Sequence, residues 1–274
     1  MERQMIEKKK KMYELVTVIA GILFAISLVL LLVLQDPIAM IGFFIPVPMF
    51  IISQLQFKKL SVNFKEYLIK PEIAKLVEQA NYLPKEGLSK EFVYGSGVLK
   101  KEDRFHSEDY LEGMIKNRRF VSSDVHLQDV RSNGKTTTVV TVFQGRFFEI
   151  EFEKKFEHDV YIFPNFLHRF SLGRGLELID VESIIFNKKF DVFSKDQQSA
   201  FYLLKPRFIE KLIEFHNSYK RVFYGFKDNK VYIAIDTRKD AFDLKMFKAI
   251  DEHFFKEIKL EIKLIEDLID LITN

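Results

Sequence analysis

Few residues in this sequence have types and spacing suited to chemistry, and two histidine–carboxylate pairs come nearest to it. His106 lies three residues before Asp109, and Asp124 lies two residues before His126. On a strand, residues 124 and 126 share a face, so they would approach a common metal ion or proton. A catalytic site needs a third convergent group, which the sequence does not identify. Solvated or locally hydrogen-bonded side chains are therefore the simpler interpretation of this polar cluster.

Four arginines make a second candidate site, for an anion or a lipid headgroup. The guanidinium group pairs with phosphate through two parallel hydrogen bonds, so the residue type fits such a ligand. The segment 171–175, Ser-Leu-Gly-Arg-Gly, would supply a flexible phosphate loop, although an ordinary surface loop is the simpler account. The four are Arg118, Arg119, Arg169 and Arg174.

The sequence lacks the common catalytic and nucleotide-binding motifs. It contains no GxxxxGK[ST], GxGxxG, HExxH or GxSxG pattern. Its six histidines are never paired at the spacing of metal ligands, and the absence of cysteine excludes disulfides, thiolate zinc sites and cysteine nucleophiles. We therefore predict no catalytic residues, no metal site and no cofactor.

Composition limits the class of protein. Forty-two Lys and Arg residues nearly balance 39 Asp and Glu residues, which leaves a net charge of +3 and gives no reason to expect a nucleic-acid partner. Hydrophobic residues make up 47% of the chain, too many for a disordered protein. The chain should therefore fold, and its partners should be lipid or protein.

The run from Leu15 to Leu34 is the strongest signal in the chain. Its 20 residues carry no charge, and a helix of that length, rising about 1.5 Å per residue, covers the roughly 30 Å hydrocarbon core of a bilayer. Fifteen of the 20 are Leu, Ile, Val or Phe, whose insertion is worth about −5 to −9 kcal/mol. A cleaved signal peptide is the alternative, but the run is too long and lacks an A-x-A-like cleavage site.

A second apolar run covers residues 38–57 and is weaker than the first. Three polar residues dilute it, and Pro46 and Pro48 would remove backbone hydrogen bonds that lipid cannot replace, so a re-entrant or interfacial segment is the alternative. Only a short loop separates the two runs, which favours a helical hairpin. We therefore expect residues 1–57 to form a membrane anchor with transmembrane helices at 15–34 and 38–57.

The distribution of Lys and Arg around the two runs predicts their orientation. Basic residues precede the first run and follow the second, whereas the loop between them has only Asp36. The positive-inside rule then predicts a multi-pass protein of the inner membrane with both termini in the cytoplasm. Lys58 and Lys59 either touch anionic lipid headgroups or only set this topology. Neither run contains an ionisable residue, so a pore or transporter is not expected from the hairpin alone.

The remaining sequence predicts an α+β fold. Residues 58–90 are expected to form a juxtamembrane helical linker, with helix over 60–80 broken near Pro71. In the α+β cytosolic domain, residues 91–245, apolar residues alternate from 92 to 163, which predicts mainly antiparallel strands. Turn residues predict hairpins at Asn133-Gly134 and within 227–230.

Further elements are predicted toward the C-terminus. A second part of the sheet is expected over 181–193, followed by a helix over 197–219 in which Pro206 marks a bend or a fresh start. Residues 242–273 repeat isoleucine and phenylalanine every three or four positions, and domain 246–274 is expected to be a long amphipathic helix. This helix either leaves the domain and self-associates or packs along the sheet.

Four motifs follow one another along the chain: FQGRFF at 143–148, FNKKFDVFSKD at 186–196, AFYLLKP at 200–206 and NKVYIAI at 229–235. In this order they resemble an uncharacterised bacterial membrane-anchored family known only as a domain of unknown function. The resemblance covers roughly residues 105–250 and implies a preceding pair of membrane helices, but it brings no catalytic residues. From the residues themselves we expect Asp196 to cap a helix and Gly145 to supply a bend or bulge.

These observations favour a membrane-anchored cytosolic binding or scaffold module with a lipid bilayer and a protein as partners. The alternative is a membrane-bound hydrolase or phosphate-handling enzyme using His106, Asp124 and His126 with Arg118 or Arg119. The alternative requires these side chains to converge in one concave pocket.

Overall fold

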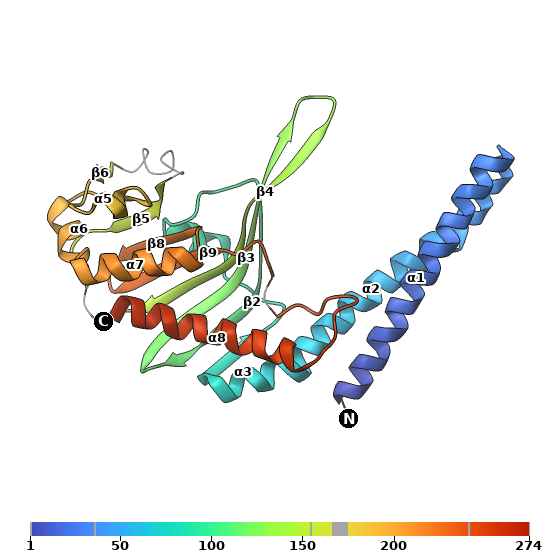
Figure 1. Ribbon diagram of the computed structural model, residues 1–274, viewed down its shortest axis with the longest axis horizontal. Coiled ribbons are helices and arrows are strands. Elements are labelled where there is room, and N and C mark those ends of the chain that lie inside the picture. Colours follow the sequence, from blue (N-terminus) through green and yellow to red (C-terminus); the bar gives the residue numbers. More distant parts are fainter. Residues whose placement is uncertain (1, 36, 154, 166–174, 241, 274) are drawn as a thin grey trace. The chain divides into compact units, whose positions relative to one another are not determined.

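The computed structural model describes residues 2–35, 37–153, 155–165, 175–240 and 242–273. The chain forms two compact units: unit 1 comprises residues 1–72 and 242–257, and unit 2 comprises residues 73–241 and 258–274. The helices of unit 1 and the sheet of unit 2 confirm the α+β class (Figure 1).

Unit 1 is built on an antiparallel helical hairpin. Its elements are α1 (Glu2–Leu34), the 3₁₀ segment η1 (Pro37–Phe44), α2 (Pro46–Phe64), the π-helical turn η2 (Lys65–Ile69) and α3 (Lys70–Leu76), which passes from unit 1 into unit 2. Small and polar side chains join the two arms: the Ser27 hydroxyl donates to the Gly42 carbonyl (2.9 Å), and the hydroxyls of Thr17 and Ser53 lie 2.9 Å apart. Because residues 17 and 27 pair with 53 and 42, the two arms run side by side, as the hairpin prediction requires.

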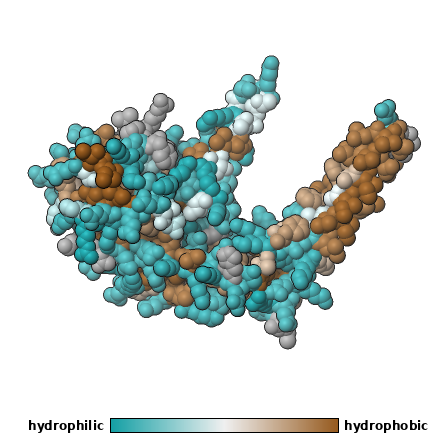
Figure 2. Space-filling view, viewed as in Figure 1, coloured by the Kyte–Doolittle hydropathy of each residue, from teal (hydrophilic) through white to brown (hydrophobic). Residues whose placement is uncertain are grey.

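The outward-facing side chains of this hairpin are apolar and uncovered. Two helices, Glu2–Leu34 and Met40–Leu76, are long and apolar enough to cross a membrane, and only 11% and 17% of their most apolar stretches are buried. Figure 2 shows the uncharged part of the hairpin as a continuous hydrophobic rod. A core helix of a soluble protein would instead bury most of this surface.

The prolines act differently from the prediction. Residues 38–57 do not form one α-helix, because η1 ends at Phe44 and α2 begins at Pro46, where the missing N–H of proline costs nothing in the first helical turn. The predicted break near Pro71 is also wrong. The helix continues through Pro71 to Leu76, and η2 ends two residues before the proline, where a wider π-turn makes room for the ring.

A second part of unit 1 comes from far along the chain. Residues 242–251, which we call the strap, were predicted to be helical but lack regular structure, and α8 begins only at Glu252 and ends at Thr273. The strap is held by contacts to the hairpin: Lys65 pairs with Asp243 (2.6 Å), and Arg3 donates to the Ile250 carbonyl (2.5 Å). These contacts to the strap's side chains and backbone replace the hydrogen bonds that an additional helical turn would have formed.

Unit 2 is built on a nine-stranded antiparallel sheet with the order β1-β2-β3-β4-β9-β8-β5-β7-β6. The predicted hairpins are confirmed: β3 and β4 join through Asn133-Gly134, and β8 and β9 join through Asp228-Asn229. The strands are β1 (Glu78–Leu83), β2 (Arg104–Ile115), β3 (Arg118–Ser132), β4 (Thr137–Glu151), β5 (Val160–Pro164), β6 (Glu177–Ile179), β7 (Phe190–Ser194), β8 (Val222–Lys227) and β9 (Lys230–Asp236).

Helices cover both faces of this sheet. On one face, α4 (Lys90–Gly95) and its flanking residues pack Val93 and Val98 against Phe143 and Phe147 of β4. On the other face lie α7 (Pro206–Ser218) and the unit 2 part of α8, which are joined by a hydrogen bond from Lys211 to the Asp270 carbonyl (2.9 Å; Figure 1). The apolar stripe of α8 is buried here: Ile258, Ile262, Ile265, Leu268, Ile269 and Ile272 are all less than 9% exposed. Of the two interpretations of this helix, packing along the sheet is therefore the one that the structure shows.

Several boundaries differ from the prediction. The helix predicted to reach Ala80 ends at Leu76, because residues 78–83 pair with β2 as an edge strand. Residues 181–193 are only partly strand, since α5 (Ile184–Asn187) precedes β7. The helix predicted over 197–219 starts afresh at Pro206, which separates α6 (Gln197–Leu203) from α7, and the Asp196 carboxylate caps α6 by accepting the Ser199 N–H (2.7 Å), as expected.

Gly145 is required by a close approach between strands. The register of β3 and β4 shifts near Phe143, not at Gly145, so a bulge does not explain the glycine. A Cβ at position 145 would instead overlap the carbonyl oxygen of Ile235 in β9. Glycine therefore allows β4 and β9 to pair at this point.

We expect Gly145→Ala to destabilise the protein by about 1–3 kcal/mol, because the added methyl group overpacks the junction of β4 and β9. The matched control is Gly95→Ala in α4, where a Cβ would meet no atom within 4 Å and the change should stay within about 0.5 kcal/mol. Denaturant unfolding of both variants in mild detergent, followed by circular dichroism, measures the difference. Equal stability of the two variants would contradict this account.

Candidate functional site

The predicted anion-binding arginines do not form a patch in the described part of the chain. Arg118 pairs with Glu153 (2.6 Å), whereas Arg119 lies 3.5 Å from Glu112 and 4.0 Å from Glu151. As neighbours on β3, the two arginines point to opposite faces of the sheet. Arg169 and Arg174 lie outside the described residues.

Lys58 and Lys59 are placed differently from the arginines. Both are exposed on α2, directly after the end of its apolar run. Neither forms an ion pair with a described residue, so their charges remain available to an anionic surface.

The predicted polar cluster separates into two parts. Asp109 and Asp124 are buried, at 0% and 5% exposure. His106 has a side chain that is 69% exposed and lies opposite His126 in the register of β2 and β3. The imidazole of His126 lies 3.0 Å from the Thr141 hydroxyl. The two carboxylates therefore lie in the protein interior, whereas the two imidazoles lie at or near its surface.

The buried part is centred on Arg146 of β4, which the sequence analysis did not select. Its guanidinium donates to the Asp124 carboxylate (3.0 Å) and to the Ser122 hydroxyl (2.8 Å), and it lies 5.8 Å from the centre of the Phe148 ring. Asp124 and Arg146 are direct partners in the register of β3 and β4. The pair therefore bridges β3 and β4 on the face of the sheet that α8 covers.

A second buried contact continues this cluster toward the edge of the sheet. Asp109 occupies a bulge in β2 with a φ of 57°, and its carboxylate accepts the Tyr82 hydroxyl of β1 (2.5 Å). Asp109 is an extra residue in the strand, so its side chain turns inward where regular alternation would not place it. The bulge therefore brings a third strand into the polar interior.

Electrostatics keep the tyrosine and the arginine of this cluster each in one charge state. Burial, followed by the negative charge of Asp109, raises the pKa of Tyr82 far above its ordinary value. Burial alone would lower the pKa of Arg146, but the charges of Asp124, Glu261 and Asp109 outweigh it and raise this pKa. Tyr82 therefore stays neutral and Arg146 stays charged throughout the physiological range. Neither group can serve as a proton carrier near pH 7.

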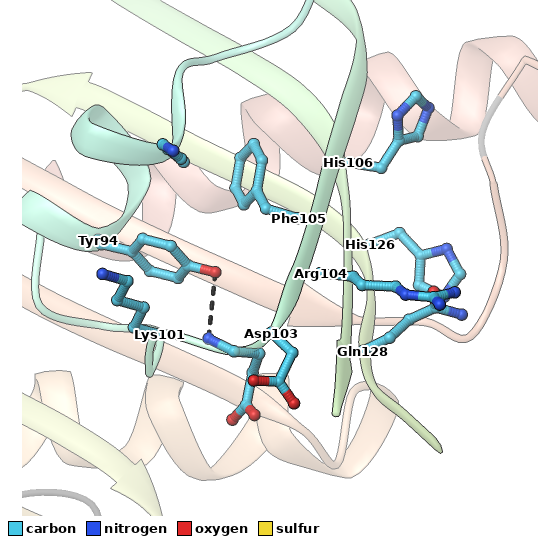
Figure 3. Close-up of a pocket in the computed structure, with 10 residues that line it drawn as sticks. Tyr94, Lys101, Asp103, Arg104, Phe105, His106, His126 and Gln128 are labelled. Atoms are coloured by element: carbon cyan, nitrogen blue, oxygen red, sulfur yellow. Dashed lines mark hydrogen bonds between the residues drawn. The ribbon is translucent and has the colours of Figure 1, made fainter. Parts of the chain in front are cut away.

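The histidines line a separate, shallow concavity of about 550 Å³. Figure 3 shows Tyr94 and Phe105 on one side of β2 and His106 and His126 on the other. The Tyr94 hydroxyl is already hydrogen-bonded to the backbone, because it accepts the Glu102 N–H (3.3 Å). The concavity also contains Lys90, Lys101, Asp103, Arg104 and Gln128. The convergence of His106, Asp124 and His126 with Arg118 or Arg119, which a hydrolase would require, is not formed.

A second polar concavity, of about 490 Å³, also has Tyr94 in its lining. Lys195 and Lys227 face it, but Glu157 and Asp159 line the same opening. Because positive and negative side chains line the same opening, their electrostatic potential would concentrate neither an anion nor a cation.

The most distinctive surface of unit 2 is apolar. Ile184 and Ile185 of α5 are 72% and 63% exposed, and Phe201 and Tyr202 of α6 are 44% and 68% exposed. Both helices pack on β7, and a hydrophobic area is visible at this end of the unit (Figures 1 and 2). We call these four residues the α5–α6 patch. The sequence analysis missed it because helical spacing does not separate a buried from an exposed apolar residue at the ends of short helices.

Comparison with known proteins finds a family match over part of the chain and no activity. Residues 141–273 match the family described as Protein of unknown function (DUF3137), which confirms the resemblance to an uncharacterised family. No curated protein matches the chain. Among solved structures, the crystal structure of the mycobacterial trehalose monomycolate transport factor A, TtfA, is similar at 10% identity. It covers 70% of this chain and 88% of that chain, with a TM-score of 0.38.

We expect Arg146→Met to destabilise the protein by about 3–5 kcal/mol, because it leaves the Asp124 carboxylate buried without its partner. Adding Asp124→Leu should recover part of the loss, since an apolar pair carries no desolvation penalty. The exposed pair supplies the control: Arg119→Gln should cost at most about 1 kcal/mol. Denaturant unfolding of the three variants and the unaltered chain measures these costs, and equal costs for Arg146→Met and Arg119→Gln would refute the assignment.

Proposed function

We propose that this chain is a membrane-anchored cytosolic binding module without catalytic activity. The observation that carries the proposal is the α1–α2 hairpin, whose outward side chains are apolar and uncovered over a length that matches a bilayer. Soluble monomers rarely expose an apolar patch larger than a few hundred Å², and a bilayer removes this surface from water.

The contacts inside the hairpin support a lipid environment. Lipid tails are as apolar as leucine, so helices in a membrane associate through small residues and interhelical hydrogen bonds. Here Gly42 lies against Ser27 so closely that a Cβ on Gly42 would come within 2.8 Å of its hydroxyl oxygen. Ser53 also donates to the backbone carbonyl of Tyr13 (3.0 Å). The large apolar side chains face outward instead.

The lysine distribution gives the proposed orientation. The charged start of α1 and exposed Lys58 and Lys59 lie at the same end of the antiparallel hairpin, which is the end from which unit 2 continues. With this end in the cytoplasm, both termini and unit 2 are cytoplasmic, and the protein is a multi-pass protein of the inner membrane.

A binding role fits unit 2 better than catalysis. Its charged interior is paired and closed beneath α8, while the two concavities lack convergent catalytic groups among the residues described. The α5–α6 patch, in contrast, offers exposed isoleucine and aromatic side chains, the composition of a protein contact. We propose that a protein partner binds there.

The proposed topology can be tested with single cysteines, because the natural chain has none. Gln35→Cys, between the two helices, should react with a membrane-impermeant maleimide in intact spheroplasts. Glu91→Cys, whose native side chain is 72% exposed in α4, should react only after the membrane is opened. Labelling of Glu91→Cys from outside, or recovery of the chain in the soluble fraction, would refute the anchor.

The proposed partner surface can be tested by a charge insertion. A chain with Ile185→Asp and Phe201→Asp should lose proteins that co-purify with the unaltered chain in mild detergent. We expect a loss of at least about 2 kcal/mol in binding, roughly 30-fold in Kd. Glu214→Lys, at an exposed position of α7, is the control and should keep them. Identical retention by both variants, or no retained protein with the unaltered chain, would contradict a partner at this surface.

A further inference from the structure

The strap contacts both arms of the hairpin at the level where the first apolar run begins and the second ends. The Glu14 carboxylate, which directly precedes Leu15, accepts the backbone N–H of Phe247 (2.7 Å). On the other arm, the Gln54 amide lies 3.8 Å from the sulfur of Met246. Gln54 belongs to the apolar run of α2, one helical turn before Lys58. The two contacts therefore place Met246 and Phe247 at the boundary between the charged and apolar parts of unit 1.

Phe247 is exposed at this boundary. Its ring is 66% exposed, whereas the neighbouring strap residues Phe242, Leu244 and Ile250 are each only 6% exposed. Its backbone has a φ of 60°, a left-handed conformation that is uncommon for an aromatic residue. In water, the exposed ring of Phe247 gains no free energy from the hydrophobic effect. At a membrane–water interface, aromatic rings are favoured at the headgroup level.

The charges around Phe247 complement an anionic surface. Lys245 is exposed and forms no ion pair with a described residue, as is also true of Lys58 and Lys59. The acidic residues beside them are already engaged: Asp243 pairs with Lys65, and Glu14 pairs with Lys10. The free charges at this level are therefore positive, and such clusters attract anionic lipid headgroups.

We infer that the strap is an interfacial membrane contact, with Phe247 inserted at the boundary of headgroups and acyl chains and with Lys245, Lys58 and Lys59 on anionic headgroups. The inference rests on the proposed membrane anchor and extends it. A segment that follows the sheet in sequence would then complete the anchor built by the first residues.

The absence of native tryptophan permits a direct test in the full chain. Phe247→Trp is reconstituted in vesicles of phosphatidylcholine with and without phosphatidylglycerol. Brominated lipids with bromine about 5–10 Å below the surface should quench its fluorescence several-fold more than they quench Leu260→Trp, an exposed position of α8. Ile22→Trp, within the first apolar run, is the deep control. Circular dichroism checks the fold, and Ala249→Trp is a second probe if Phe247→Trp is unstable.

Each outcome bears on one claim. If Ile22→Trp is quenched by lipid while both strap probes behave like Leu260→Trp and are quenched by aqueous acrylamide, the strap inference fails and the anchor stands. If Ile22→Trp is not quenched by lipid, the anchor itself fails. Phosphatidylglycerol should shift the Phe247→Trp emission further to the blue, and Lys245→Gln should reduce that shift. Indifference to both changes would overturn the role of the lysines.

Discussion

The guanidinium of Arg146 is a positive charge held inside unit 2, and the surrounding structure keeps it paired. An unpaired charge at this depth would cost several kcal/mol, so the partner strand must place a carboxylate directly opposite. Asp124 does so in the register of β3 and β4, and the second guanidinium nitrogen is satisfied by Ser122. A shift of one residue in this register would reverse the faces of every side chain and leave both charges without partners.

The same constraint explains the neighbouring strands. Glycine at 145 allows β9 to approach β4 beside the arginine, and the bulge at Asp109 turns an additional carboxylate inward. The α8 helix then closes the cluster with isoleucines and with the negative charge of Glu261. These groups form a closed polar interior whose pairing depends on the register of the strands. Its tyrosine and arginine do not titrate near neutral pH.

Unit 1 follows a different rule, because its large apolar side chains face outward. Its two arms meet through Ser27, Gly42, Thr17 and Ser53, which are small enough for close backbone approach. Leucine and isoleucine cover the outside, where a soluble protein would place polar residues. The two units thus expose apolar surface in different ways, one as a rod suited to lipid and the other as the compact α5–α6 patch suited to a protein. Both features favour a protein that works through binding.

Local patterns determined much of this protein by themselves. The uncharged run Leu15–Leu34, the alternation in 92–163 and the Asn133-Gly134 turn depend on neighbouring residues only, so the hairpin, the strands and their turns followed from the sequence. The helix cap at Asp196 and the start of a new helix at Pro206 likewise depend only on neighbouring residues, so the sequence predicted both. What only the tertiary structure decided involves residues distant in sequence. The pairing of β1 with β2 overrode a helical pattern, and the docking of the strap on α1 and α2 prevented ten residues from joining α8. Of the candidate site, the sequence named Asp109 and Asp124 but not Arg146 or Tyr82, because a pairing that crosses strands is set by their register, which no single segment encodes.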